Sequence, residues 1–206
     1  EKGVALLTQN RQFQWFSRPT YIFPVVPATA ATMLKKAGHE VLFLDGIAAE
    51  LSDAEFDRRL AEFKPELVVL ETKTPVVKRH WSWIDSHDYR CVMVGDHVTA
   101  MPEETLANSK TWAVIPGGDW DYGLMDYIAA GCPKGVQPFA LRDSIKDLPW
   151  IDRELVHWEL YAKKNGNFKR TPGTYIMAGR DCWHAKCTFC SWTTLYPRYR
   201  VREVKD

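Results

Sequence analysis

Three cysteines crowded into residues 182–190 are the part of the sequence best suited to chemistry. Their spacing is Cys182-x4-Cys187-x2-Cys190, and the other two of the five cysteines, Cys91 and Cys132, stand alone. An odd number with two isolated thiols does not make a disulfide framework. Three thiolates this close together can bind one soft metal centre in a reducing compartment. The spacing therefore predicts a metal site.

Two kinds of metal centre are compatible with this spacing. A structural zinc ion would need a fourth ligand, from His184 or a remote residue. Closed zinc sites more often use two separated ligand pairs, and the sequence has no second pair. An iron–sulfur cluster bound by three cysteines leaves one iron open for a substrate-like ligand. The spacing favours the cluster over zinc.

The elements that must position this loop begin with short apolar runs that alternate with helical segments. The expected strands are 4–7, 39–45, 67–70, 91–94 and 112–115, and the expected helices are 28–37, 52–63, 75–86, 102–109 and 122–130. Continuous apolar runs are typical of strands buried on both faces. Their alternation with helices predicts an α/β fold with a Rossmann-like, doubly wound parallel sheet.

Small polar residues and glycines follow the expected strands, at the sheet edge where such folds bind ligands. The candidate ligand contacts at this edge are Thr8, Asp45, Thr72, Gly95, Asp96, His97, Gly117, Gly118 and Asp119. Neither the Gly-x-Gly-x-x-Gly fingerprint of dinucleotide sites nor a P-loop is present. The edge is therefore not expected to bind NAD or ATP.

The chain changes character after its expected sheet. Residues 133–172 contain four prolines and one expected helix, within 152–161, and a strand at 174–177 leads through a turn into the cysteine loop. This organisation predicts a Rossmann-like domain over 1–132, a connector over 133–172 and the start of a second module over 173–206.

The cysteine loop and the first domain resemble a known family. Cys187-Thr-Phe-Cys190, preceded by a strand and a further cysteine, resembles the cluster loop of radical SAM enzymes, although four residues separate Cys182 from Cys187 where three are usual. The segments 27–45 and Gly95-Asp-His-Val-Thr99 resemble cobalamin-binding domains fused to radical SAM modules, and 148–155 resembles the segment before their cluster strand. Together these resemblances cover essentially the whole chain.

The resemblance implies a cobalamin-binding type of Rossmann-like domain followed by the beginning of a radical SAM partial (β/α) barrel. Cys182, Cys187 and Cys190 would bind a 4Fe–4S cluster that cleaves S-adenosylmethionine reductively, and Phe189 would lie near the cluster or S-adenosylmethionine. The edge residues named above would contact cobalamin. The outcome would be methyl transfer to an unactivated carbon, or a related radical rearrangement or cyclisation. Because a barrel needs roughly 200 further residues, the chain is expected to be an N-terminal part that is inactive alone.

Several roles follow from this reading. The substrate would be a small molecule or peptide, and the electron would come from a partner such as flavodoxin or ferredoxin. His97 is not favoured as a cobalt ligand, because Asp96 precedes it directly and no glycine stands at position 100. Arg198, Arg200 and Arg202 read as a solvated basic stretch. The alternative is a non-catalytic cobalamin-binding module with a structural zinc site in its tail.

Charge and composition bear on whether the protein binds nucleic acid or spans a membrane. The 206 residues carry 27 Lys and Arg against 26 Asp and Glu, which gives a net charge of +1 and argues against binding of nucleic acid. No run approaches the roughly 20 apolar residues of a membrane span, and the first residues lack the apolar core of a signal peptide. A cytoplasmic location is expected.

Overall fold

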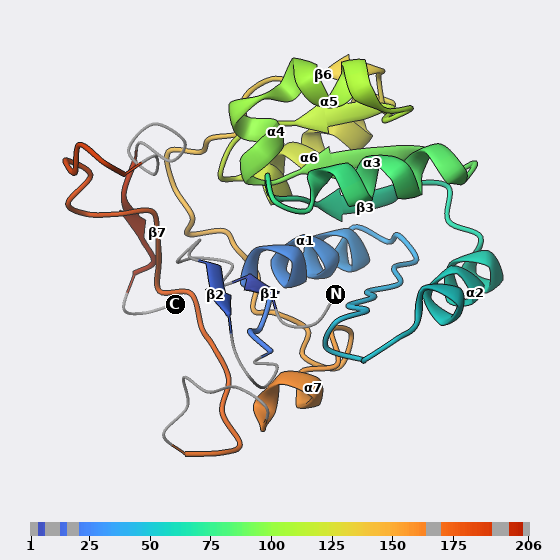
Figure 1. The fold of residues 1–206 in the computed structure, drawn as a ribbon. Coiled ribbons are helices and arrows are strands. Elements are labelled where there is room, and N and C mark those ends of the chain that lie inside the picture. The colour runs from blue at the N-terminus through green and yellow to red at the C-terminus, as the bar shows by residue number, and fades with distance from the viewer. Residues whose placement is uncertain (1–3, 7–12, 16–20, 164–169, 191–197, 204–206) are drawn as a thin grey trace. The chain divides into compact units, whose positions relative to one another are not determined.

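The computed structural model describes residues 4–6, 13–15, 21–163, 170–190 and 198–203 (Figure 1). The chain divides into two compact units, one made of residues 1–64 and 149–177 and the other of residues 65–148 and 178–206. The second unit contains a four-stranded, all-parallel sheet, so the α/β class and the parallel sheet are confirmed. The predicted boundaries at 132 and 172 stay predictions.

The parallel sheet is built from buried apolar runs. Its strands are β3 (Val68–Glu71), β4 (Cys91–Val94), β5 (Ala113–Ile115) and β6 (Gly135–Val136), hydrogen-bonded in that order. Every residue of β4 and β5 is buried. The pattern agrees with the predicted strands at 67–70, 91–94 and 112–115, because a strand covered on both faces needs an uninterrupted apolar sequence.

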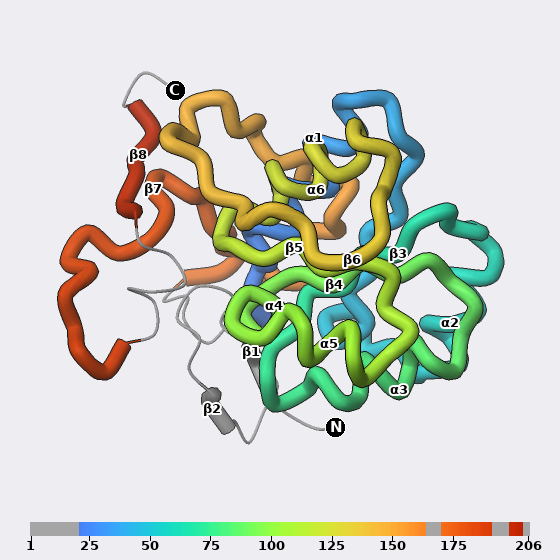
Figure 2. Tube along the Cα trace, turned by 90° about the horizontal axis from the view of Figure 1, so that it is seen from above, coloured from blue at the N-terminus to red at the C-terminus, as the bar shows by residue number. Residues whose placement is uncertain are grey.

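Helices cover both faces of this sheet. They are α3 (Val77–Ser86), α4 (Asp96–Ala100), α5 (Pro102–Asn108) and α6 (Trp120–Ala129), with α3 to α5 on one face and α6 on the other (Figure 2). Trp81 and Ile84 of α3 pack with Val98 of α4 against Met93 and Val114 of the sheet. Three of the four helices were expected from the apolar spacing; α4, a single short turn, was not.

The second unit also contains a short antiparallel ribbon that flanks the cysteine loop. Its strands are β7 (Gly179–Arg180) and β8 (Arg200–Val201), with Arg180 opposite Arg200. The prediction of a strand at 174–177 is wrong, because those residues form no strand and the pairing begins at Gly179. The partial barrel stays a prediction.

The first unit is helical around an aromatic core. It contains α1 (Val25–Lys36), α2 (Asp53–Phe63), α7 (Glu159–Ala162) and the antiparallel pair β1 (Val4–Leu6) and β2 (Phe13–Trp15). Phe23 and Tyr161 meet edge to face at 5.4 Å within this core. The Ser52 Oγ accepts a hydrogen bond from the Glu55 N–H at 3.2 Å and so caps α2, which agrees with the predicted helix over 52–63.

Two predicted strands of the sheet take other forms. Residues 4–6 pair antiparallel with β2, and residues 39–45 form no strand although they are well described. A strand exists only where a neighbouring backbone completes its hydrogen bonds, and the apolar side chains of Val41 and Phe43 instead pack onto the core of the first unit. The helix predicted at 152–161 is turns followed by the short α7.

Candidate functional site

Seven of the predicted ligand contacts lie together at the carboxyl ends of β3, β4 and β5. They are Thr72, Gly95, Asp96, His97, Gly117, Gly118 and Asp119. Parallel strands end at one sheet edge, so segments that are far apart in sequence meet there. Asp45 belongs to the first unit, and Thr8 lies outside the described residues.

Two glycines at this edge are required by the protein's own backbone. Gly95 has φ +101°, and a Cβ there would lie 2.6 Å from the carbonyl oxygen of Thr72. Gly117 has φ +109°, and a Cβ there would lie 2.3 Å from the carbonyl oxygen of Ala140. Thr99 links the two positions, because its Oγ1 donates to the Gly95 carbonyl at 2.7 Å and accepts from the Gly117 N–H at 3.0 Å. The edge is thus a closely packed crossing of backbone segments.

The end of β3 contributes buried polar groups to the same edge. The Thr72 Oγ1 lies 2.9 Å from the His80 Nδ1 of α3, and the Lys73 Nζ lies 3.7 Å from the Asp96 Oδ2. Burial, with a smaller contribution from Arg79, lowers the pKa of His80 to about 4, so its ring is neutral at pH 7. A buried lysine, a carboxylate and a neutral imidazole here can recognise polar groups of a ligand such as amides or a phosphate.

His97 lies between helices. Its side chain is 4% exposed, with Nδ1 3.2 Å from Thr74 Oγ1, Nε2 3.7 Å from Glu104 Oε2 and the ring edge-on to Trp81 at 5.7 Å. Burial lowers the pKa of His97, and the nearby Glu104 carboxylate opposes that shift only in part. This packing among Thr74, Trp81 and Glu104 favours a structural imidazole over a cobalt ligand.

Asp45 terminates an extended segment of the first unit. Its Oδ1 accepts from the N–H groups of Ile47 and Ala48, both at 3.0 Å, and its Oδ2 accepts from the Tyr161 hydroxyl at 2.7 Å. These contacts are those of a turn cap. Its contact with cobalamin stays a prediction.

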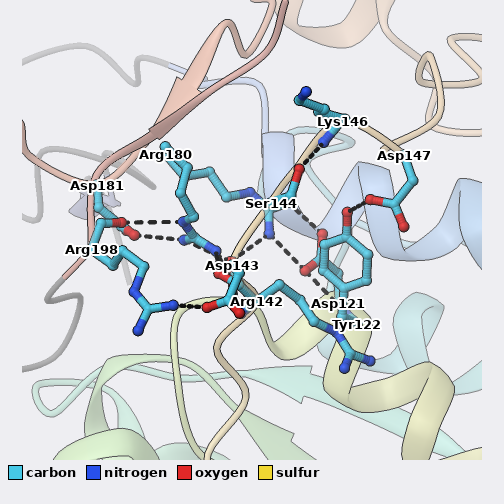
Figure 3. A network of polar contacts seen from close by, with 12 residues as sticks. Asp121, Tyr122, Arg142, Asp143, Ser144, Lys146, Asp147, Arg180, Asp181 and Arg198 are labelled. Atoms are coloured by element: carbon cyan, nitrogen blue, oxygen red, sulfur yellow. Dashed lines mark hydrogen bonds and ion pairs between the residues drawn. The ribbon is translucent and has the colours of Figure 1, made fainter.

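Asp119 is the centre of a buried network of five charged side chains in the second unit. Asp121, Arg180 and Asp181 of this network are labelled in Figure 3. Arg180 Nη1 donates to Asp119 Oδ1 at 2.9 Å and to Asp121 Oδ1 at 2.8 Å, and a second bond joins Arg180 Nη2 to Asp121. Arg200 donates to both oxygens of Asp119, and its Nη2 donates to Asp181 Oδ2 at 2.6 Å. The side chains of Asp119 and Asp121 are fully buried and those of both arginines are 4% exposed.

The electrostatics favour the ionised forms of Asp119 and Arg180. Burial alone would raise the pKa of Asp119, but hydrogen bonds from Arg200 and the Arg142 N–H, together with Arg180, outweigh it and lower that pKa. Burial likewise works against the Arg180 charge, and Asp121 and Asp119 outweigh it to raise the pKa of Arg180. The charges of Asp119 and Arg180 therefore compensate one another, which a buried ion pair requires. Asp181 differs, because its burial outweighs the bond from Arg200 and raises its pKa.

The cysteine loop lies between the two arginines in sequence. Cys182, Cys187 and Cys190 form no disulfide and are of intermediate exposure, and the Cys190 N–H donates to the Cys187 carbonyl at 3.2 Å, which forms a turn. Phe189 is 91% exposed and Trp183 is 77% exposed. The loop thus presents its aromatic side chains outward.

The residues present fit a soft metal by their kind of donor. Three thiols outside any disulfide, on one turn-containing loop, are the ligands that a cluster or zinc requires. Within the described residues, no three His, Cys, Asp or Glu side chains are already gathered around one point. Ligand loops commonly close only as the metal binds, because binding supplies the free energy that orders them.

Sequence reasoning missed the two arginines of this site. The expectation of a solvated stretch is wrong for Arg200, which is 6% exposed, because Asp119 and Asp181 compensate its charge inside the protein. The alternation Asp119-x-Asp121, together with Arg180-Asp181 beside the first cysteine, was the available signal. Only the fold shows that these segments meet.

Comparisons with known proteins assign no class. No family model matches the chain, and neither a curated protein nor a solved structure matches it significantly. Among the described residues, no helix has both the length and the apolarity needed to cross a membrane. The function is therefore argued from the chain's own residues.

Proposed function

We propose that this chain carries the cluster-binding segment and the cobalamin-binding domain of a radical SAM enzyme. One observation carries the proposal: a Cys-x4-Cys-x2-Cys loop has both its flanks bonded to Asp119, at the carboxyl end of β5. Ligands of parallel α/β sheets bind at that edge. A metal centre on the loop would therefore share one unit with the ligand-binding edge of the sheet.

The residues divide the work between two groups. Cys182, Cys187 and Cys190 would each supply a thiolate, and the cluster, when bound, supplies one electron to the sulfonium of S-adenosylmethionine. Asp96 and Gly118, the partly exposed residues of the edge, would contact the cobalamin periphery, with Lys73 and Asp96 as its charged pair, whereas the buried Thr72, His97 and Asp119 would hold the edge together. Orientation and exclusion of water are the protein's part in such chemistry. Methyl transfer and radical rearrangement share this front end.

Iron content tests the cluster. Anaerobic reconstitution of the chain with iron and sulfide should give about four irons per chain, as a cluster of the 4Fe–4S type requires. Cys190→Ala should lose this iron, whereas Cys132→Ala, which alters a lone thiol outside the loop, should retain it. Tight binding of one zinc with no iron uptake in the unaltered chain would overturn the proposal.

Absorption spectroscopy tests the cobalamin part separately. Titration with hydroxocobalamin should give saturable binding that persists when Cys182, Cys187 and Cys190 are all changed to alanine, because the sheet edge does not depend on the thiols. His97→Gln should leave the spectrum of the bound corrinoid unchanged, since His97 is enclosed by Trp81 and Thr74. Absence of binding would remove cobalamin and leave the cluster proposal to its own test.

The alternative is a non-catalytic cobalamin-binding module whose tail is stabilised by zinc. The same three thiols favour it as donors, and His184 in the loop is exposed and could serve as a fourth. Under this alternative, zinc would order the segment after residue 178 in the unaltered chain. It would not do so in the variant with Cys182, Cys187 and Cys190 changed to alanine.

A further inference from the structure

The described parts of the segment that carries the cysteine loop bury little apolar surface. Within the described residues 178–190 and 198–203, Arg180 and Arg200 are the only residues buried as a whole. Tyr199 is 48% exposed and Val201 is 53% exposed. Hydrophobic burial, the usual source of tertiary attachment, therefore contributes little here.

Backbone pairing is also slight. The ribbon β7–β8 has two residue pairs, extended by a bond from the Arg202 N–H to the Ala178 carbonyl at 2.8 Å. Isolated two-stranded ribbons are marginal in water even when they are longer. The buried charges are thus the principal contact that fixes the two ends of the loop.

Arg200 joins several segments that are far apart in sequence. Besides Asp119 and Asp181, it donates from Nη1 to the Arg142 carbonyl at 2.7 Å and from Nε to the Arg198 carbonyl at 3.1 Å. Asp181 directly precedes Cys182. Arg200 therefore ties the residue beside the first cysteine to the sheet edge at Asp119, across the gap that the loop spans.

We propose that Arg200 is a positioning residue for the metal centre of the cysteine loop: it sets where Cys182 stands relative to Cys187 and Cys190 by holding Asp181 against Asp119. The identity of the metal in this proposal rests on the proposed function, whereas the contacts of Arg200 with Asp181 and Asp119 are independent of it. Arginine is needed because its planar fork bonds two carboxylates at once, which an ammonium group cannot reproduce.

The test compares Arg200→Lys with Arg198→Lys. Both keep a positive charge, but Arg198 is half exposed and pairs with the exposed Asp143. In the metal-free chain, Arg200→Lys should accelerate amide exchange of residues 179–183 at least tenfold while leaving β4 and β5 unchanged, and Arg198→Lys should match the unaltered chain.

The metal-bound chain supplies the decisive readout. After reconstitution, Arg200→Lys should show altered g values of the reduced cluster and faster loss of iron to a chelator, and Arg198→Lys should show neither. If Arg200→Lys fails to fold, Asp181→Asn, which removes only the arm beside Cys182, takes its place with the same expected changes. Identical spectra, retention and exchange in the two lysine variants would overturn the proposal.

The two proposals fail in different ways. If the unaltered chain binds zinc and no iron, the radical SAM assignment fails, and faster zinc loss from Arg200→Lys would still support the positioning role. If iron binds normally and Arg200→Lys changes nothing, the positioning role fails alone.

Discussion

Gly117→Ala tests the close backbone crossing at the carboxyl end of the sheet. An added Cβ would lie 2.3 Å from the carbonyl oxygen of Ala140 and 2.6 Å from its nitrogen. That backbone cannot retreat cheaply, because the Ala140 N–H donates to the Pro116 carbonyl at 2.7 Å and its carbonyl accepts from the Asp119 N–H at 3.1 Å. The substitution therefore combines two costs: a positive φ, roughly 1–3 kcal/mol, and overpacking, roughly 1–3 kcal/mol.

Gly135→Ala separates the two costs. Gly135 has φ +101°, close to the +109° of Gly117, but no atom lies within 4 Å of the position its Cβ would take. Gly135→Ala should therefore lower the free energy of unfolding by the cost of the positive φ alone, roughly 1–3 kcal/mol. Both positions lie in the same unit, so one measurement reports on both.

The measurement is the free energy of opening of β4 and β5, from amide hydrogen exchange, supported by urea unfolding. Gly117→Ala should be less stable than Gly135→Ala by at least about 1 kcal/mol, the lower end of the overpacking cost. Equal losses in the two variants would refute the reasoning, because they would show that the contact with Ala140 costs nothing. A Gly117→Ala variant as stable as the unaltered chain would refute the backbone geometry as well.

Three further predictions concern other positions. His80 is neutral in the folded chain because its pKa is lowered to about 4. As the pH drops from about 6.5 to about 4, the unfolded chain takes up a proton on His80 first, so the free energy of unfolding should fall by at most about 3 kcal/mol. In urea titrations at several pH values, His80→Gln should flatten this dependence of stability on pH, and an unchanged dependence would contradict the assignment. Ser52→Ala should cost about 0.5–2 kcal/mol through loss of the α2 cap, seen as faster exchange in α2, whereas Ser82→Ala, at an exposed position on α3, should cost nothing measurable. Burial raises the pKa of the Cys91 thiol to about 11, so at pH 8 about one Cys91 thiol in a thousand is ionised. Cys91 should therefore react with a disulfide reagent far more slowly than the thiols of the cysteine loop. Labelling at equal rates in the folded chain would show that Cys91 is accessible.

The sheet could be predicted in part from sequence because its signals are local. The apolar runs of β4 and β5 and the capping residue of α2 each specify their element through contacts with near neighbours or through burial on both faces. β6 has only Gly135 and Val136, too few residues to show a pattern. The apolar run at 39–45 carries the same signal as β4, and only tertiary pairing decides which run becomes a strand.

The candidate site, too, could be predicted from the sequence only in part. The cysteine spacing and the polar residues after each strand are visible in the chain, since a parallel sheet brings its strand ends together. The network of Arg180, Arg200 and Asp119 is not visible, because it joins positions 61 and 81 residues apart. Charged residues are nearly always solvated, so a buried arginine is recognised only with its partners.

The anchoring of the cysteine loop by charges at its two ends also affects how its length can vary. The bonds described for Arg180 and Arg200 go to residues 119, 121, 142, 181 and 198, all outside the stretch that carries the cysteines. Anchors of this kind set where the loop begins and ends and leave the number of residues between them open. Lengthening such a loop by one residue raises its closure cost by less than about 0.1 kcal/mol. One residue more or less between Cys182 and Cys187 should therefore change the stability of the fold very little, and under the proposed function a restriction on that spacing would come from the metal.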